Sequence, residues 1–346
     1  MGNDSSILAD GSAMAVPGTS FNHTLFETAL PPLPTFSLEV QPDLFPWVSD
    51  FWLNLLLPVV VYWVLSLTFH AIDVNDWFPQ YRLHTPEEIT KRNHVSRFEV
   101  ARDVILQQII QVVTGALLAL SEPPEMIGKV SRNELSQLLL DTHPLLAGAV
   151  AGGYYPSLVG ANSEPAFASW EMTLAKTIYY FLIPAVQYFI GAAIIDTWQY
   201  FLHRLMHVNK WLYVHFHSRH HRLYVPYAYG ALYNHPVEGF LLDTLGAAVA
   251  FKVTRMTLRQ GILFFSMSTI KTVDDHCGYA FPWDPLQIVT SNNAEYHDIH
   301  HQHWGIKTNF AQPFFTFWDT LLDTKYRGSK TNKPGQKKAK VEEKAQ

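Results

Sequence analysis

Histidines concentrate between residues 203 and 303, a stretch that holds 12 of the 17 histidines in the chain. They form three short patterns: HRLMH at 203–207, HSRHH at 217–221 and HDIHH at 297–301. Imidazole is the commonest neutral metal ligand in proteins, and few other chemistries need so many of these side chains together. The composition of this stretch therefore predicts a metal site.

The spacing within each pattern places its histidines on one face of a helix. His203 and His207 are four residues apart, so both rings would project from the same face, one turn apart. In the two HxxHH patterns the first, fourth and fifth positions again share a helical face. Eight imidazoles exceed the roughly four to six positions around one ion, so two metal ions are expected. The eight predicted ligands are His203, His207, His217, His220, His221, His297, His300 and His301.

Two isolated histidines lie in polar breaks beside apolar stretches, His235 in YNHPVEG and His276 in VDDHCGY. Either could complete the coordination, and His276, next to two aspartates, is the favoured one. His215 and His303 fit the helical faces poorly and are expected to be neighbours of the site. Carboxylates and amides nearby would accept hydrogen bonds from the ring nitrogens and so fix their tautomers. The candidates for this role are Asp196, Asn234, Glu238, Asp275 and Asp298.

The composition excludes several other kinds of protein and site. The net charge of −5 gives no indication of nucleic-acid binding. Cys277 is the only cysteine, which excludes a disulfide within the chain and zinc sites of the CxxC type. Any metal must therefore be held by histidine, with or without carboxylates. Aromatic residues make up 14% of the chain and charged residues only 16%, as in a membrane protein with substantial polar parts.

Three long apolar runs predict membrane-spanning helices, at 51–72, 103–120 and 173–195. The run at 103–120 contains three glutamines, so a helix lying in the membrane interface is the alternative there. The third run is expected to continue through Asp196 into the first histidine pattern. Two shorter apolar stretches, 239–253 and 257–273, predict a hairpin that dips into the bilayer.

The distribution of basic residues predicts the orientation. Residues 1–50 contain no lysine or arginine and are expected to be luminal and poorly ordered. The basic loop at 73–102 and the basic, disordered tail at 327–346 would be cytosolic, and the histidine patterns would share that side. The small-residue segment 145–161 is expected to be re-entrant or to lie on the surface.

The histidine patterns and their surroundings resemble a known family. HRLMH, HSRHH and EYHDIHH are similar to the three histidine boxes of the fatty acid hydroxylase/sterol desaturase superfamily. NNAEYHDIHHQHWGIKTNFAQPFFTFWDTLLDT ends in the FWDxLxxT signature that closes this domain. The resemblance covers about residues 180–326, after an N-terminal membrane region at 51–179 with about two spans. Within the superfamily the chain is most similar to the fungal sphinganine 4-hydroxylases.

The resemblance implies an all-α integral membrane protein, a transmembrane helical bundle with a cytosolic helical cap that carries a histidine-rich di-metal site. It implies oxygen insertion at carbon 4 of a sphingoid base, free or within a ceramide, in the endoplasmic reticulum membrane. Two iron ions, dioxygen and electrons from NAD(P)H through a reductase and a b-type cytochrome are the expected cofactors and partners, although zinc could replace iron in purified protein. The ligands implied are His203, His207, His217, His220, His221, His276, His297, His300 and His301, with His235 as a further candidate.

Two other functions fit parts of the sequence. A sterol methyl oxidase or sterol desaturase would carry the same histidine boxes, and only the residues of the substrate chamber would distinguish it. A histidine-rich metal transporter or store would place ionisable residues inside the spans. The runs 51–72 and 178–195 contain no Asp, Glu, Lys or Arg, which counts against transport.

Overall fold

The computed structural model describes residues 38–120, 124–128, 174 and 177–328. The expectations for the first 37 residues, for 145–161 and for the tail from 329 onward lie outside the described residues. The described part is helical apart from one small antiparallel ribbon, in which β1 (Leu38–Val40) pairs with β2 (Met126–Gly128).

Two long apolar helices follow the N-terminal strand. Helix α1 (Asp50–Val74) begins at Ser49, whose hydroxyl accepts the backbone N–H of Trp52. Helix α3 (Arg97–Ala119) begins in the same way at Ser96, which caps Glu99. Serine is favoured at this position because its side chain satisfies an N–H that has no partner within the helix. Both helices lie where the apolar runs predicted them.

The third apolar run forms α6 (Ile183–Val208), which follows a π-helical turn at Ile178–Leu182. The helix is continuous through Asp196 to His207, as the sequence predicted, so its last turns carry the first histidine pattern. Among the described residues three helices are long and apolar enough to cross a membrane: α1, α3 and the helix Ile178–Val208.

The two shorter apolar stretches form the predicted hairpin of helices. Helix α9 (Leu245–Thr254) continues a π-helical segment at Phe240–Thr244 and ends at Arg255. Helix α10 (Leu258–Asp275) then begins with a capping box at Thr257. Because α9 packs against α6 while α10 packs against α1, the hairpin lies between these two long helices.

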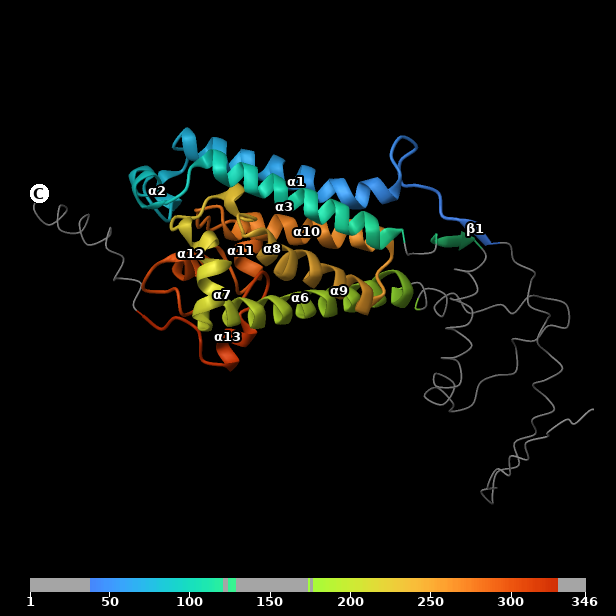
Figure 1. Cartoon of the computed structure of the whole chain (residues 1–346). Helices are drawn as coiled ribbons and strands as arrows, with labels where there is room; N and C mark the ends of the chain where they lie inside the picture. The colour runs from blue at the N-terminus through green and yellow to red at the C-terminus, as the bar shows by residue number, and fades with distance from the viewer. Residues whose placement is uncertain (1–37, 121–123, 129–173, 175–176, 329–346) are drawn as a thin grey trace, which may run out of the picture.

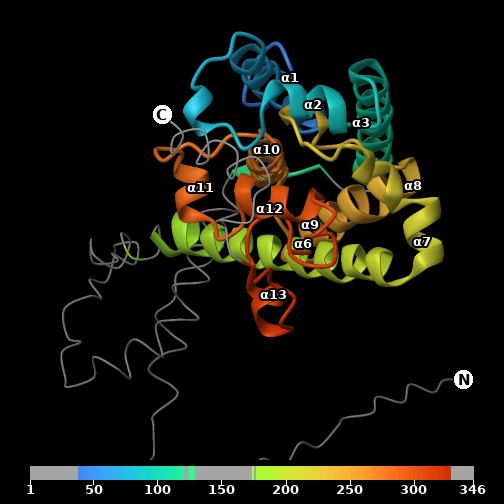
Figure 2. The ribbon, with the colours of Figure 1, turned by 90° about the vertical axis from the view of Figure 1, so that its left-hand side faces the viewer.

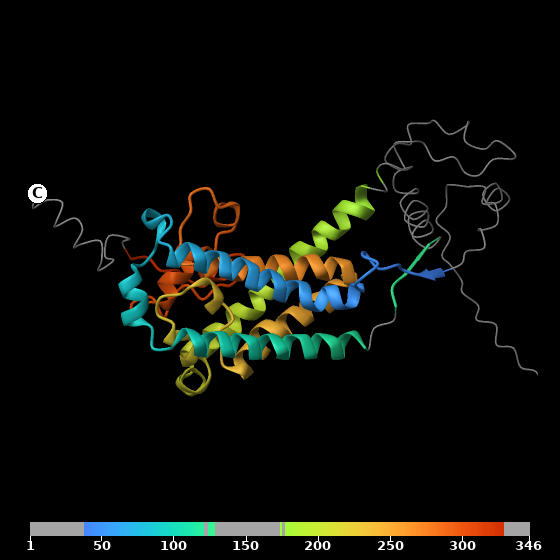
Figure 3. The same ribbon diagram turned by 90° about the horizontal axis from the view of Figure 1, so that it is seen from above.

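The long helices run along one direction, with α1 and α3 on one side of the hairpin and α6 on the other (Figure 1). Seen from above, α6 crosses the other helices obliquely (Figure 3). The short helices gather at one end of the bundle, where α12 lies between α6 and α10 (Figure 2). These are α2 (Pro86–Arg92), α7 (Lys210–His215), α8 (Pro236–Gly239), α11 (Pro285–Val289), α12 (Ala294–His301) and α13 (Phe317–Leu321).

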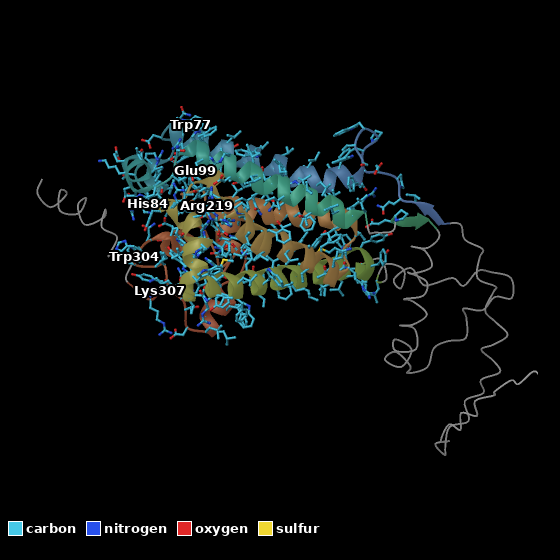
Figure 4. All side chains as sticks on the ribbon, in the orientation of Figure 1. Trp77, His84, Glu99, Arg219, Trp304 and Lys307 are labelled. Atoms are coloured by element: carbon cyan, nitrogen blue, oxygen red, sulfur yellow. The ribbon has the colours of Figure 1, made fainter. Side chains whose placement is uncertain are left out.

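The second histidine pattern does not form an α-helix. Residues His217–Arg222 form a 3-10 helix, which has about three residues per turn and a tighter radius than an α-helix. Ion pairs fix this turn against α3: Arg219 contacts Asp103, and Arg222 pairs with Glu99 at 2.6 Å. Arg219 and Glu99 are seen at this end of the bundle in Figure 4.

Candidate metal centre

Nine histidines lie together in two groups at this end of the bundle, and within each group one ligand atom per residue lies within 4.8 Å of the others. Group 1 consists of His203, His207, His217, His221 and His300. Group 2 consists of His220, His276, His297 and His301. The nine are the histidines that the resemblance implied, and His276 joins them as favoured from the sequence.

Both HxxHH patterns divide between the two groups. On α12, His297 and His301 are one turn apart and belong to group 2, whereas His300 belongs to group 1. On the 3-10 turn, His221 belongs to group 1 and its neighbour His220 to group 2. Each HxxHH pattern therefore supplies nitrogens to both groups. The two groups are adjacent, since the rings of His221 and His301 have centroids 5.1 Å apart.

Hydrogen bonds to Nδ1 fix the tautomers of most of these rings. A backbone carbonyl oxygen can only accept a hydrogen bond. A neutral imidazole whose Nδ1 contacts such an oxygen therefore carries its proton on Nδ1 and has a lone pair on Nε2. The Nδ1 atom of His217 instead contacts the Glu238 carboxylate at 2.5 Å. The carbonyl contacts are His203 to Phe310 at 2.8 Å, His220 to Tyr233 at 3.0 Å, His276 to Thr272 at 2.8 Å, His300 to Thr308 at 2.7 Å and His301 to Leu223 at 2.9 Å.

The Nε2 atoms point at one another within each group. In group 2 the Nε2 atom of His297 lies 2.9 Å from that of His276 and 3.0 Å from that of His301, and both of these rings carry their proton on Nδ1. A single N–H on His297 could donate to only one of them, so at least two lone pairs face each other in a buried site. The Nε2 atoms of His220 and His300 are buried without any partner. A cation among these nitrogens would satisfy all of them, and the donor set therefore fits one metal ion in each group.

Burial also keeps these rings neutral. It lowers the pKa of His220 to about 4 and that of His276 to about 3, because an imidazolium ion loses its hydration there. Near neutral pH the Nε2 lone pairs are therefore available to a metal. Imidazole suits iron, zinc, copper and nickel, so the nitrogens do not by themselves identify the metal.

The predicted hydrogen-bond acceptors lie close to the site, but most bind other groups. Asp196 accepts the backbone N–H groups of Phe314 and Phe315, at 3.0 and 2.6 Å. Asp275 forms an ion pair with Lys271. These contacts hold the loop after α12 and the end of α10 in place, rather than orienting a ligand ring.

Two other predicted hydrogen-bond acceptors, Asp298 and Asn234, form hydrogen bonds with residues that belong to neither histidine group. Asp298 contacts His84 at 2.7 Å, and Figure 4 shows His84 at the outer end of the bundle. Asn234 lies beside His220, and its side-chain amide donates to Asp243 at 3.2 Å. Among the predicted carboxylates only Glu238 contacts a ligand ring. The remaining ring acceptors are backbone carbonyls, which no side-chain pattern reveals.

His235 is not a member of either group. It caps α8, where its Nδ1 accepts the backbone N–H of Val237 at 3.2 Å, and its ring packs on Phe216. The structure thus gives His235 a capping role, and its role as a ligand stays a prediction. His215, which stacks on Trp211, and the exposed His303 also lie outside both groups, as expected.

A cavity of 660 Å³, lined mainly by apolar side chains of α1, α3, α9 and α10, extends along the inside of the bundle. A smaller pocket lies directly beside the histidines. Four residues line both spaces and so form the junction between them: Gln199, Asp243, Thr272 and Pro313. The cavity therefore adjoins the pocket beside the histidine groups at these four residues.

The protein-family model described as "Fatty acid hydroxylase" matches residues 188–324 of this chain. The chain is 47% identical to the sphingolipid C4-hydroxylase of Saccharomyces cerevisiae, over 89% of this chain and 81% of that protein. It is 42% identical to sphinganine C4-monooxygenase 1 of Arabidopsis thaliana, over 80% of this chain and 88% of the relative. Methylsterol monooxygenase 1 of Rattus norvegicus is 33% identical over only 45% of this chain and 48% of its own length. No solved structure matches.

Proposed function

This chain belongs to the fatty acid hydroxylase family, and we propose that it is a membrane-bound monooxygenase that hydroxylates carbon 4 of a sphingoid base. The observation that carries the proposal is the position of the histidine groups beside a small pocket that shares four lining residues with a larger, mainly apolar cavity. The cavity has the size of a ligand site, since such sites are typically about 300–1,000 Å³. An apolar lining between membrane-type helices favours a lipid chain as its occupant.

We propose iron for both groups. Two iron ions bound there would supply the activation of dioxygen and the removal of hydrogen from an unactivated carbon. The residues of this chain would hold and orient that centre: nine imidazoles present Nε2 or an equivalent nitrogen, while Glu238 and the backbone carbonyls hold the rings. Zinc bound to the same nitrogens is the alternative for purified protein.

The arrangement assigns the substrate a direction. The alkyl chain would lie in the cavity, where the apolar walls exclude water, and carbon 4 would lie at the junction lined by Gln199 and Thr272. The polar carbons 1 to 3 would then also lie near the junction, because they are separated from carbon 4 by only one to three bonds.

The loop between α1 and α3 supports a proposed orientation in the membrane. It carries Arg82, Lys91 and Arg92, and Arg92 donates to Gln302, next to His301, at 2.6 Å. The histidine groups therefore lie on the side of this loop, which we propose to be the cytosolic side of the endoplasmic reticulum membrane, because cytosolic loops are enriched in lysine and arginine. Electrons would reach the centre there from NAD(P)H through a reductase and a b-type cytochrome.

Expression in a fungal strain that lacks its own sphingoid 4-hydroxylase tests the proposal, with lipids measured by mass spectrometry. Phytosphingosine should form with the intact chain and not with His300→Ala. An altered sterol profile with unchanged sphingoid bases would instead favour a sterol oxidase. No lipid change from a folded, iron-containing protein would favour metal storage or transport.

A further inference from the structure

One partly buried acid at the junction forms no ion pair within the described part of the chain. Asp243 lies on the π-helical segment Phe240–Thr244, and it lines both the substrate cavity and the pocket beside the histidines. π-helical turns are frequent at functional sites because they displace a side chain from the regular helical face. No lysine, arginine or histidine among the described residues forms an ion pair with Asp243.

Two amides hold the carboxylate in place. Gln199 donates its Nε2 to one oxygen at 3.2 Å, and Asn234 donates its Nδ2 to the other at 3.2 Å. A carboxylate has about four acceptor sites, so these two bonds leave others free. Asp243 is partly accessible although burial raises its pKa to about 7, and its accessible surface lies in the cavity that it lines.

The other acids around the site have partners. Asp275 pairs with Lys271, Glu238 contacts His217, and Asp196 accepts two backbone N–H groups. Glu238 and Asp275 line only the pocket beside the histidines, so among the described acids Asp243 is the one that lines both that pocket and the cavity. An isolated buried carboxylate is costly, and a cationic group of the substrate would offset that cost.

The proposed substrate carries such a group at the required place. A sphingoid base has hydroxyls on carbons 1 and 3 and an ammonium on carbon 2, two bonds from carbon 4. Its nitrogen therefore lies within about 4 Å of the carbon that is hydroxylated. When carbon 4 is at the junction, the ammonium must be there too.

We infer that Asp243 binds the ammonium group of a free sphingoid base and thereby positions carbon 4 at the metal centre. The inference rests on the proposed function and adds a substrate preference to it. An N-acylated base has a neutral amide at carbon 2, so it cannot form this ion pair. The enzyme should therefore prefer the free base over the N-acylated form.

The test compares sphinganine with N-acetylsphinganine, which differ at carbon 2 only in the charge and the acetyl group. Asp243→Asn should lower kcat/KM for sphinganine by at least about tenfold, because a charge-assisted hydrogen bond is lost. For N-acetylsphinganine the fall should be less than about threefold. Asp243→Glu should keep the preference for the free base, since the charge remains. Asp323→Asn is the matched control, because Asp323 is exposed and pairs only with Arg327 at the surface.

Equal fractional losses for both substrates in Asp243→Asn, at unchanged metal content, would overturn the inference. If that variant does not fold, competition in the intact enzyme decides: octadecylamine should inhibit at least about tenfold more strongly than octadecanol. Equal inhibition by the two would also overturn it. A wild-type enzyme that hydroxylates neither substrate would instead contradict the proposed function, so the two failures are distinguishable.

Discussion

Adjacent histidines on the 3-10 turn should control different metal ions. His220 belongs to group 2, which has four nitrogens, while His221 belongs to group 1, which has five. His220→Ala leaves three protein ligands in its group, and His221→Ala leaves four. We therefore expect His220→Ala to lose one ion, whereas His221→Ala should keep both, with weaker binding in group 1.

The magnitude follows from the number of ligands. A structural four-ligand zinc site contributes about 10–16 kcal/mol, or roughly 2.5–4 kcal/mol per ligand, and each 1.4 kcal/mol is a factor of about ten. Loss of His220 should thus weaken group 2 by about two to three orders of magnitude. Loss of one of five ligands in group 1 should cost less, because four nitrogens can still complete a tetrahedral site.

The assay is the metal content of each purified variant by mass spectrometry after dialysis against increasing concentrations of a chelator. Wild-type protein should retain two ions, His220→Ala one and His221→Ala two, with release at a lower chelator concentration. His235→Ala is the control, because His235 lies outside both groups and should leave two ions. Loss of one ion from both ligand variants at the same chelator concentration, or retention of two by His220→Ala, would refute the division of the nitrogens into these groups.

Three further predictions concern the surroundings of the centre. Glu238→Gln keeps the shape but replaces the carboxyl group that contacts His217 with an amide, and should weaken metal binding by about 10- to 100-fold in a chelator competition; unchanged affinity would argue against an orienting role. Arg219→Ala removes an ion-pair partner of Asp103, and because the arginine is partly exposed, the free energy of unfolding should fall by about 1–2 kcal/mol. An unchanged midpoint of thermal unfolding would show that other contacts hold the 3-10 turn. His303→Ala should change kcat/KM by less than about twofold, and a complete loss of turnover would place this exposed residue in the site.

The elements that carry the site could be predicted from the sequence because their signals are local. Apolar runs longer than about 18 residues predicted α1, α3 and α6, and the last of these was expected to continue into His203 and His207. The many histidines predicted a metal centre. Because the single cysteine excludes thiolate-type sites, imidazole and carboxylate were the ligands left to bind the metal. The number of histidines exceeded the positions around one ion, which indicated two.

The assignment of each nitrogen to a group depended on the tertiary structure. An HxxHH pattern does not indicate whether the segment forms a 3-10 helix or an α-helix. The sequence therefore could not show that His220 and His221 belong to different groups. The acceptors that hold the rings are mostly carbonyls of Phe310, Thr308 and Leu223, which the path of the chain brings to the site from distant segments. A backbone carbonyl has no sequence signature, because every residue carries one.

Two individual residues also depended on the tertiary structure. His235 was a candidate ligand because it lies in a polar break beside an apolar stretch, and only the folded chain shows that it caps α8. Asp243 lies in an apolar stretch that gives no sequence signal for a site residue. Its position at the junction results from the packing of the hairpin between α1 and α6. Side-chain chemistry and helical periodicity thus determined which residues could bind metal and which segments cross the bundle. The packing of distant segments decided which nitrogens lie in the same group and what lies beside them, because those contacts join residues that are far apart in the sequence.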